Sequence, residues 1–149
     1  MFWLVIITSG LVGVGLLRLT GASQLELGAP SWAPSVSTAR WISLFAFSSA
    51  TWGIGLAVAT GTRASLIGGL WIASLLLQWV WVRMVLTPRL SAAFTMHNVA
   101  WVATFLAAGA AWASSSLGGY LTVPLLLWLI FLGGVTFFLW QINQPSQRR

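Results

Sequence analysis

The sequence consists of five long apolar runs separated by short polar, glycine-containing or proline-containing interruptions. The interruptions lie near residues 28–31, 60–63, 87–89 and 114–119, and a polar tail follows from Asn143. A helix that crosses a hydrocarbon core of about 30 Å needs roughly 20 residues, so each run is long enough for one crossing. We predict membrane-spanning helices over about Phe2–Leu19, Ala39–Thr60, Ala64–Leu86, Leu90–Ala113 and Gly119–Ile142.

The five predicted helices leave no room for a soluble domain, so we predict one all-α membrane domain over residues 1–149. A transmembrane β-barrel needs strands of about ten residues with alternating polarity, and continuous runs such as Val123–Val135 do not alternate. The first run lacks a basic start and carries Arg18 near its end, so we interpret it as a retained helix and not a signal peptide. Short connections make neighbouring helices antiparallel in one five-helix bundle.

Two interruptions differ from simple short turns. The connection over residues 20–38 is long enough to cap the cytoplasmic mouth of the bundle, as lids and binding loops do. Before the fifth run, Gly118 and Gly119 are expected to interrupt helical structure and so to separate the fourth helix from the fifth. The third run is expected to end at Thr87, because a residue before proline is disfavoured in the helical region.

Composition and charge agree with a membrane protein and give it an orientation. The chain is 58% hydrophobic and 5% charged, whereas soluble domains have about a quarter charged residues. All seven basic residues are arginines, and six of them fall on the side shared by the first loop, the third loop and the C-terminus; only Arg63 falls on the other side. The positive-inside rule therefore predicts a cytoplasmic first loop and C-terminus, with the N-terminus outside.

The same composition limits partners and chemistry. The net charge of +6 marks topology and contact with anionic lipid of the bilayer, and the chain presents no basic surface for nucleic acid. The absence of cysteine excludes thiolate catalysis and Cys metal sites, and the runs lack Asp, Glu and Lys. We expect no metal site and no conventional catalytic residue, since Ser48 and Ser49 have no acid–base partners. For His97, the only histidine, a hydrogen-bonded packing role is favoured over haem ligation or titration.

The 11 tryptophans are the most unusual feature of the composition. Those near predicted helix ends fit the interfacial aromatic belt: Trp3, Trp32, Trp41 and Trp140. Others lie deeper: Trp52, Trp71, Trp101 and Trp128. At about 100° per residue, aromatic and polar residues share faces in three helices: Trp41, Phe45 and Trp52; His97, Trp101, Thr104 and Trp112; Pro124, Trp128 and Phe131. Two interpretations stay open, namely simple packing of rings and an aromatic-lined cavity for a flat, mostly apolar ligand.

The order and spacing of several motifs resemble the tryptophan-rich sensory protein, or translocator protein (TspO/MBR), family. Ala29-Pro-Ser-Trp-Ala-Pro-Ser35 is similar to the family's first-loop Lys-Pro-x-Trp-x-Pro-Pro, and Trp41-Ile-Ser-Leu-Phe45 to its second-helix Trp-x-x-Leu-Tyr/Phe. Pro124-Leu-Leu-Leu-Trp128 with Asn143 is similar to Pro-Tyr-x-x-Trp and a closing Asn, and Arg89 and Trp101 keep a spacing seen in the fourth helix. The chain departs from the family at the loop lysine, at the second loop proline and at the third-helix Asn, near which Leu77 and Gln78 stand.

The resemblance implies a five-helix, commonly homodimeric protein whose cavity binds a tetrapyrrole such as protoporphyrin IX or haem as ligand, with no required cofactor. It implies ligand contacts from Trp32, Trp41, Phe45, Trp101, Pro124, Trp128 and Asn143. Some relatives are associated with light-dependent porphyrin breakdown, which would make Trp41 and Trp128 the photo-oxidative pair. Gly69-x-x-x-Ala73 serves either a homodimer seam or packing within one chain.

Three functions follow as hypotheses. The first is a tetrapyrrole-binding membrane protein that acts in sensing, trafficking or photoprotective disposal of porphyrins. The second is an enzyme that degrades porphyrin under light. The third is a structural, pigment-contacting accessory subunit of a larger membrane complex.

Overall fold

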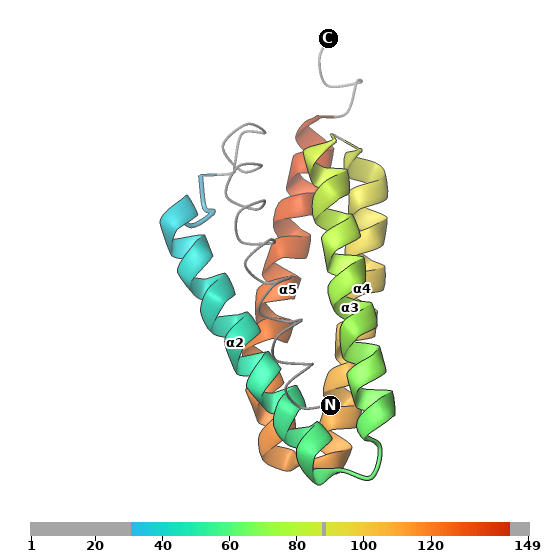
Figure 1. The fold of residues 1–149 in the computed structure, drawn as a ribbon. Helices are drawn as coiled ribbons and strands as arrows, with labels where there is room; N and C mark the ends of the chain where they lie inside the picture. Colours follow the sequence, from blue (N-terminus) through green and yellow to red (C-terminus); the bar gives the residue numbers. More distant parts are fainter. Residues whose placement is uncertain (1–30, 88, 144–149) are drawn as a thin grey trace.

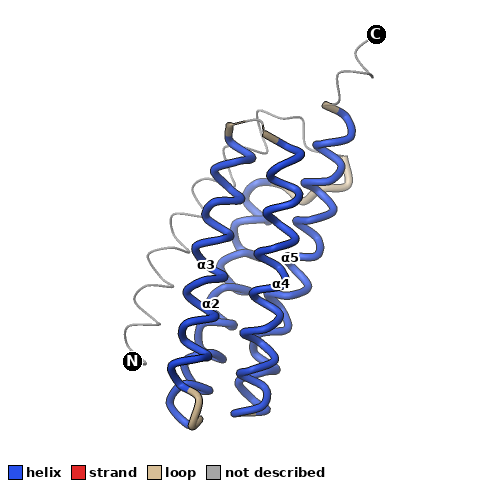
Figure 2. Tube along the Cα trace, turned by 90° about the vertical axis from the view of Figure 1, so that its right-hand side faces the viewer, coloured by secondary structure: helices blue, strands red, loops and turns tan. Residues whose placement is uncertain are grey.

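The computed structural model describes residues 31–87 and 89–143, and this part of the chain is helical without strands (Figures 1 and 2). The helices are α2 (Val36–Thr60), α3 (Ala64–Leu86), α4 (Leu90–Ser114) and α5 (Ser116–Ile142). Each of these four helices is long and apolar enough to cross a membrane. The all-α membrane prediction is therefore confirmed for the described residues. The predicted first helix, Phe2–Leu19, and most of the predicted capping loop lie outside them.

The described helices form an antiparallel bundle joined by very short connections (Figure 1). The most extensive contacts join α3 to α4, α2 to α5 and α4 to α5, while α2 touches α3 and α4 less. Because α2 and α3 run in opposite directions, Arg40, Arg83 and Arg89 lie at one end of the bundle and Arg63 at the other. The charge bias expected between the two membrane faces is thus present among the described arginines.

Two helix starts were predicted incorrectly, both three residues late. α2 begins at Val36 instead of Ala39, because the Ser35 hydroxyl accepts a hydrogen bond from the Thr38 N–H at 3.2 Å and caps the helix there. α5 begins at Ser116 instead of Gly119, because the Ser115 hydroxyl accepts from the Gly118 N–H at 3.1 Å. Ser115 alone separates α4 from α5, and α4 extends one residue beyond the predicted Ala113. The bounds of α3 agree with the prediction at both ends.

Gly118 and Gly119 therefore lie inside α5 and do not interrupt it. Instead, they allow neighbouring helices to approach closely. A Cβ on Gly118 would lie 2.7 Å from the Gly53 carbonyl oxygen, and a Cβ on Gly53 would lie 2.4 Å from the Gly118 carbonyl oxygen. The backbones of α2 and α5 thus meet at these two glycines. A Cβ on Gly119 would lie 2.6 Å from the indole of Trp112, which covers that glycine from α4. Small residues at helix crossings are typical of membrane bundles, where close van der Waals packing replaces a hydrophobic driving force.

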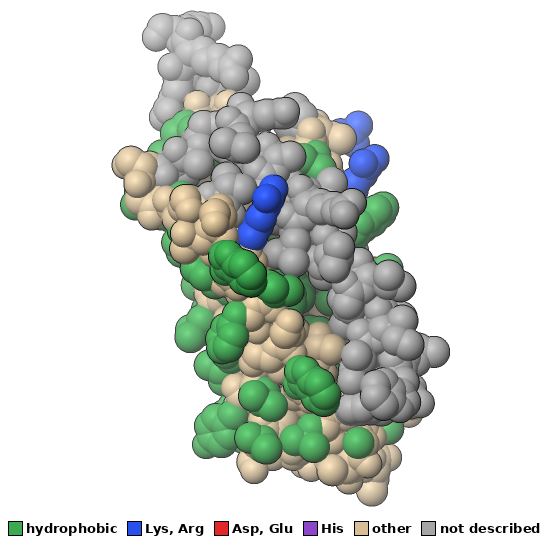
Figure 3. Space-filling model, turned by 60° about the vertical axis from the view of Figure 1, so that its left-hand side comes forward, with side chains coloured by type: hydrophobic (Ala, Val, Ile, Leu, Met, Phe, Trp, Pro, Cys, Tyr) green, Lys and Arg blue, Asp and Glu red, His purple; other side chains and the backbone are tan. Residues whose placement is uncertain are grey.

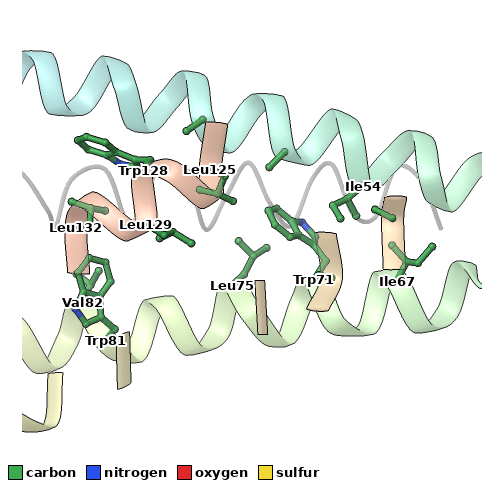
Figure 4. Packing of buried hydrophobic residues seen from close by; sticks show 14 of the residues in the cluster. Ile54, Ile67, Trp71, Leu75, Trp81, Val82, Leu125, Trp128, Leu129 and Leu132 are labelled. Carbon is green, nitrogen blue, oxygen red and sulfur yellow. The ribbon is translucent and has the colours of Figure 1, made fainter. Parts of the chain in front are cut away.

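The core lies between the helices and contains large side chains from all of them except α4, which contributes mainly alanines. Figure 4 shows Ile54 from α2, Ile67, Trp71 and Leu75 from α3, and Leu125 and Leu129 from α5 pointing into one apolar interior. These six side chains are essentially inaccessible, at 2% exposure or less. The small residues of α4, such as Ala93, Ala107 and Ala111, let it lie close against its neighbours.

α5 contains Pro124, which cannot donate a backbone hydrogen bond to the preceding turn. The neighbouring helix α2 supplies a polar contact at the same level, because the Ser49 hydroxyl donates to the Leu121 carbonyl oxygen. Prolines are tolerated in membrane helices when adjacent side chains bond the backbone groups near the disruption. α5 is one continuous helix through Pro124.

Candidate functional site

Three large aromatic side chains lie on one outward side of α2. Trp41, Phe45 and Trp52 are 70%, 66% and 60% exposed, and their spacing of four and seven residues puts them on one helix face. Trp41 and Phe45 have no ring partner among the described residues. We call Trp41, Phe45 and Trp52 the outer aromatic face. Figure 3, which brings this side of the molecule forward, shows hydrophobic side chains spread over the surface below an exposed basic one.

Trp128 is a residue of α5, and it packs against the opposite side of α2, in the interface between these two helices. It is 7% exposed, and its Nε1–H donates to the Ser43 hydroxyl at 2.9 Å. Ser43 is two residues from Trp41, which corresponds to about 200° around the helix. Trp41 and Trp128 therefore lie on different sides of α2, and the described residues do not bring them together as a stacking pair.

Trp128 belongs to an aromatic chain that reaches the segment before α2. Its ring stacks on Phe131 with centroids 5.1 Å apart and an interplanar angle of 13°. Trp32 contacts Phe131 edge-on at 5.7 Å and Phe138 at 5.9 Å. The structure thus links two of the predicted site residues, Trp32 and Trp128, through Phe131. Pro124, also predicted, lies half-buried one turn before Trp128 on α5.

Trp101, another predicted site residue, lies apart from this chain, on α4, where its ring stacks on Phe105 with centroids 5.5 Å apart. Five residues of α3 and α4 carry buried polar atoms, and we call them the polar seam: Gln78, Trp81, His97, Trp101 and Thr104. Gln78 Nε2 donates to Thr104 Oγ1 at 3.1 Å, and the rings of Trp81 and His97 are 4.8 Å apart at their centroids. Sequence reasoning found His97, Trp101 and Thr104 from their shared face and missed Gln78 and Trp81 as members of this group.

His97 has the hydrogen-bonded packing role that the sequence favours. Its Nε2 lies 2.8 Å from the Leu129 carbonyl oxygen of α5, and the side chain is 3% exposed. Gly133 makes room for the imidazole, because a Cβ there would lie 2.8 Å from Nε2. His97 thus connects α4 to α5 one residue beyond Trp128, which is itself connected to α2 through Ser43. α5 is therefore hydrogen-bonded to α2 through Trp128 and to α4 through Leu129.

Asn143, the last predicted site residue, ends α5. Its Nδ2 donates to the Leu139 carbonyl oxygen at 2.9 Å, and its backbone N–H reaches back to the same oxygen at 3.3 Å. Both contacts bond the Leu139 carbonyl group, which belongs to the last turn of the helix, where carbonyl groups lack further intrahelical partners. Within the described residues Asn143 thus has a local capping role at the end of the bundle where α2 begins.

No group of three or more potential metal-ligating side chains occurs within residues 31–87 and 89–143. The described part of the chain is therefore distinguished by its aromatic rings and by the polar seam. In comparisons with known proteins, neither a family model nor a curated protein matches the chain.

Proposed function

We propose that the protein binds a planar, largely apolar tetrapyrrole of the protoporphyrin IX or haem type, within the membrane, against the outer aromatic face of α2. The observation that supports this proposal is the exposure of Trp41 and Phe45, whose rings are 70% and 66% accessible on the same side of one helix. Aromatic rings stack on flat ligands with offset or edge geometry, and each such pair contributes about 0.5–1.5 kcal/mol beyond area burial.

The polar edge of such a ligand also has a partner of suitable chemistry nearby. Arg40 is exposed and directly precedes Trp41 at the start of α2, the end of the bundle shared with Arg83 and Arg89. An arginine guanidinium forms bidentate hydrogen bonds with carboxylates such as the propionates of protoporphyrin IX. The macrocycle would then lie along the apolar part of α2 with its propionates at the membrane surface.

The resemblance of the loop, second-helix and fifth-helix motifs to the TspO/MBR family supports the same ligand class. Trp32, Phe131 and Trp128 support the proposal indirectly, because they fix the segment before α2 and the interface of α2 with α5. We propose binding and not photo-oxidative turnover, since Trp41 and Trp128 lie on different sides of α2.

A titration of the full chain in lipid nanodiscs with protoporphyrin IX tests the proposal, with the Soret absorbance as readout. We expect saturable binding to the natural sequence. Replacing Trp41 and Phe45 with leucine removes two stacking partners, so we expect about tenfold weaker binding. The matched control is Trp79→Leu on α3, because Trp79 is 46% exposed and Arg83 lies 6.0 Å from its ring centroid.

Three results would contradict the proposal: no saturable binding, unchanged affinity in the double variant, or an equal loss of affinity in the Trp79 control. A second function, the accessory subunit of a larger membrane complex, is favoured by the same exposed face, since exposed aromatic rings also pack against partner helices or pigments. Purification from the native membrane distinguishes the two. A stable hetero-complex that protects Trp41 supports the accessory role, whereas an isolated protein that binds porphyrin supports the first.

A further inference from the structure

The polar seam contains four buried polar atoms without a hydrogen-bond partner: Gln78 Oε1, Trp81 Nε1, His97 Nδ1 and Trp101 Nε1. Gln78, Trp81 and His97 are 1%, 5% and 3% exposed, so lipid headgroups and bulk water do not reach them. Buried polar groups in folded proteins are nearly always paired, with protein or with ordered water. Four open atoms gathered in one part of a membrane bundle therefore point to something that binds there.

The hydrogen bonds that do form determine which open atoms donate and which accept. Thr104 Oγ1 donates its single proton to the Ala100 carbonyl oxygen at 2.8 Å, so it can only accept from Gln78. This contact fixes the Gln78 amide with Nε2 toward Thr104, which makes the open Oε1 an acceptor. The Leu129 carbonyl oxygen can only accept, so His97 Nε2 carries the proton and the open Nδ1 of a neutral imidazole is also an acceptor.

Trp81 and Trp101 complete the set, because an indole Nε1–H only donates. The register of the antiparallel helices brings these groups to one place. The Gln78–Thr104 bond puts Trp81, three residues further along α3, at the same level of the bundle as Trp101, three residues back along α4. His97 follows one turn beyond Trp101, and its ring contacts Trp81. The open atoms are thus two donors and two acceptors within about two helical turns of the α3–α4 seam.

We propose that the polar seam binds ordered water inside the membrane-spanning bundle. A water molecule can donate to the Gln78 Oε1 and His97 Nδ1 acceptors and can accept from the Trp81 and Trp101 indoles, so a short chain of water molecules along the seam satisfies all four open atoms. Buried waters in proteins typically make about three such bonds. The proposal is independent of tetrapyrrole binding, because it uses α3 and α4 and not the outer aromatic face.

The test is nuclear magnetic resonance of the full chain, with ¹⁵N-labelled indoles, in nanodiscs of deuterated lipid. Single Trp→Phe variants assign the Trp81, Trp101 and Trp128 indole signals. We expect magnetisation transfer from water to the Trp81 and Trp101 indole protons. A variant with Gln78→Leu and His97→Leu removes both acceptors, so we expect the transfer to Trp81 and Trp101 to be lost and the Trp128 signal to keep its wild-type behaviour.

The matched control is Asn98→Leu, which removes a polar side chain next to His97 that is exposed and bonded only to the Phe94 carbonyl oxygen of its own helix. This variant should keep the water signals of Trp81 and Trp101. If the Trp81 indole or the Trp101 indole of the natural sequence shows no magnetisation transfer from water, the proposal is overturned. This result does not depend on whether the double variant folds. Retention of both signals in a folded double variant overturns it as well.

Discussion

The contact between the α2 and α5 backbones makes a sharp prediction about Gly53. In Gly53→Ala, the new Cβ would lie 2.4 Å from the Gly118 carbonyl oxygen and 2.9 Å from Leu121 Cβ. Neither atom can rotate away, because one belongs to the backbone and the other is fixed to it. The two helices must therefore separate by about 1 Å to reach ordinary van der Waals distance.

The magnitude follows from two opposing terms. Overpacking a close-packed interior costs typically about 1–3 kcal/mol, and an obstructing backbone oxygen puts this position at the upper end of that range. In the opposite direction, alanine in place of glycine stabilises a helix by up to about 1 kcal/mol. We therefore expect Gly53→Ala to lower the free energy of unfolding by about 2 kcal/mol.

The assay is reversible unfolding in mixed micelles by titration with sodium dodecyl sulfate, followed by circular dichroism. Gly109→Ala and Gly134→Ala are the matched controls, because a Cβ at either position meets nothing within 4 Å. These two variants should be as stable as the natural sequence or more stable by up to about 1 kcal/mol. If Gly53→Ala were as stable as Gly134→Ala, the reasoning from backbone contact would be refuted.

Two further predictions concern the α2–α5 interface and the orientation of the chain. In a double-mutant cycle, Ser43→Ala and Trp128→Phe should show a coupling of about 0.6 kcal/mol, as hydrogen bonds between membrane helices typically do; additive effects would mean that the 2.9 Å contact contributes nothing. Because the chain contains no cysteine, Thr62→Cys and Thr87→Cys each introduce a single thiol. The arginine bias predicts that an impermeant thiol reagent labels Thr87→Cys from the cytoplasmic side and Thr62→Cys from the opposite side, and the reverse pattern would show that the bias does not set the orientation.

The helix bounds could be predicted well where polar residues interrupt an apolar run. Thr60 to Arg63 and Thr87 with Pro88 separate α3 from its neighbours in the sequence, and both ends of α3 agree with the prediction. The start of α5 could not be predicted from Gly118 and Gly119, because glycine allows both a helix break and a close helix crossing. Only the position of Gly53 on the facing helix shows which of these applies.

The candidate site was harder to predict than the helices, because lipid and protein interior are equally apolar. Helical periodicity grouped Trp41 with Phe45 and Trp128 with Phe131, and the structure keeps both groups. Periodicity cannot decide which group faces lipid and which faces another helix, since hydrophobicity is favourable in both places. The exposure of Trp41 and the burial of Trp128 therefore required the packing of α2 against α5.

The polar seam was only partly visible in the sequence for a related reason. Gln78 and Trp81 occur within one continuous apolar run, and no spacing rule connects them with residues of the next helix. Their significance arises from the antiparallel register of α3 and α4, in which Gln78 meets Thr104 and Trp81 meets His97.

The single-residue connection at Ser115 bears on how the chain enters the bilayer during biosynthesis. α4 and α5 are joined so closely that they already form a helical hairpin, with Trp112 lying over Gly119 just beyond the turn. If such a hairpin enters as a unit, its leading tip carries only small polar groups, and the Ser115 hydroxyl and backbone already bond within the turn. The energetic barrier of carrying a polar loop across hydrocarbon, where each unpaired backbone group costs several kcal/mol, is thereby kept small. The short connection between α4 and α5 therefore favours insertion of these two helices as one hairpin.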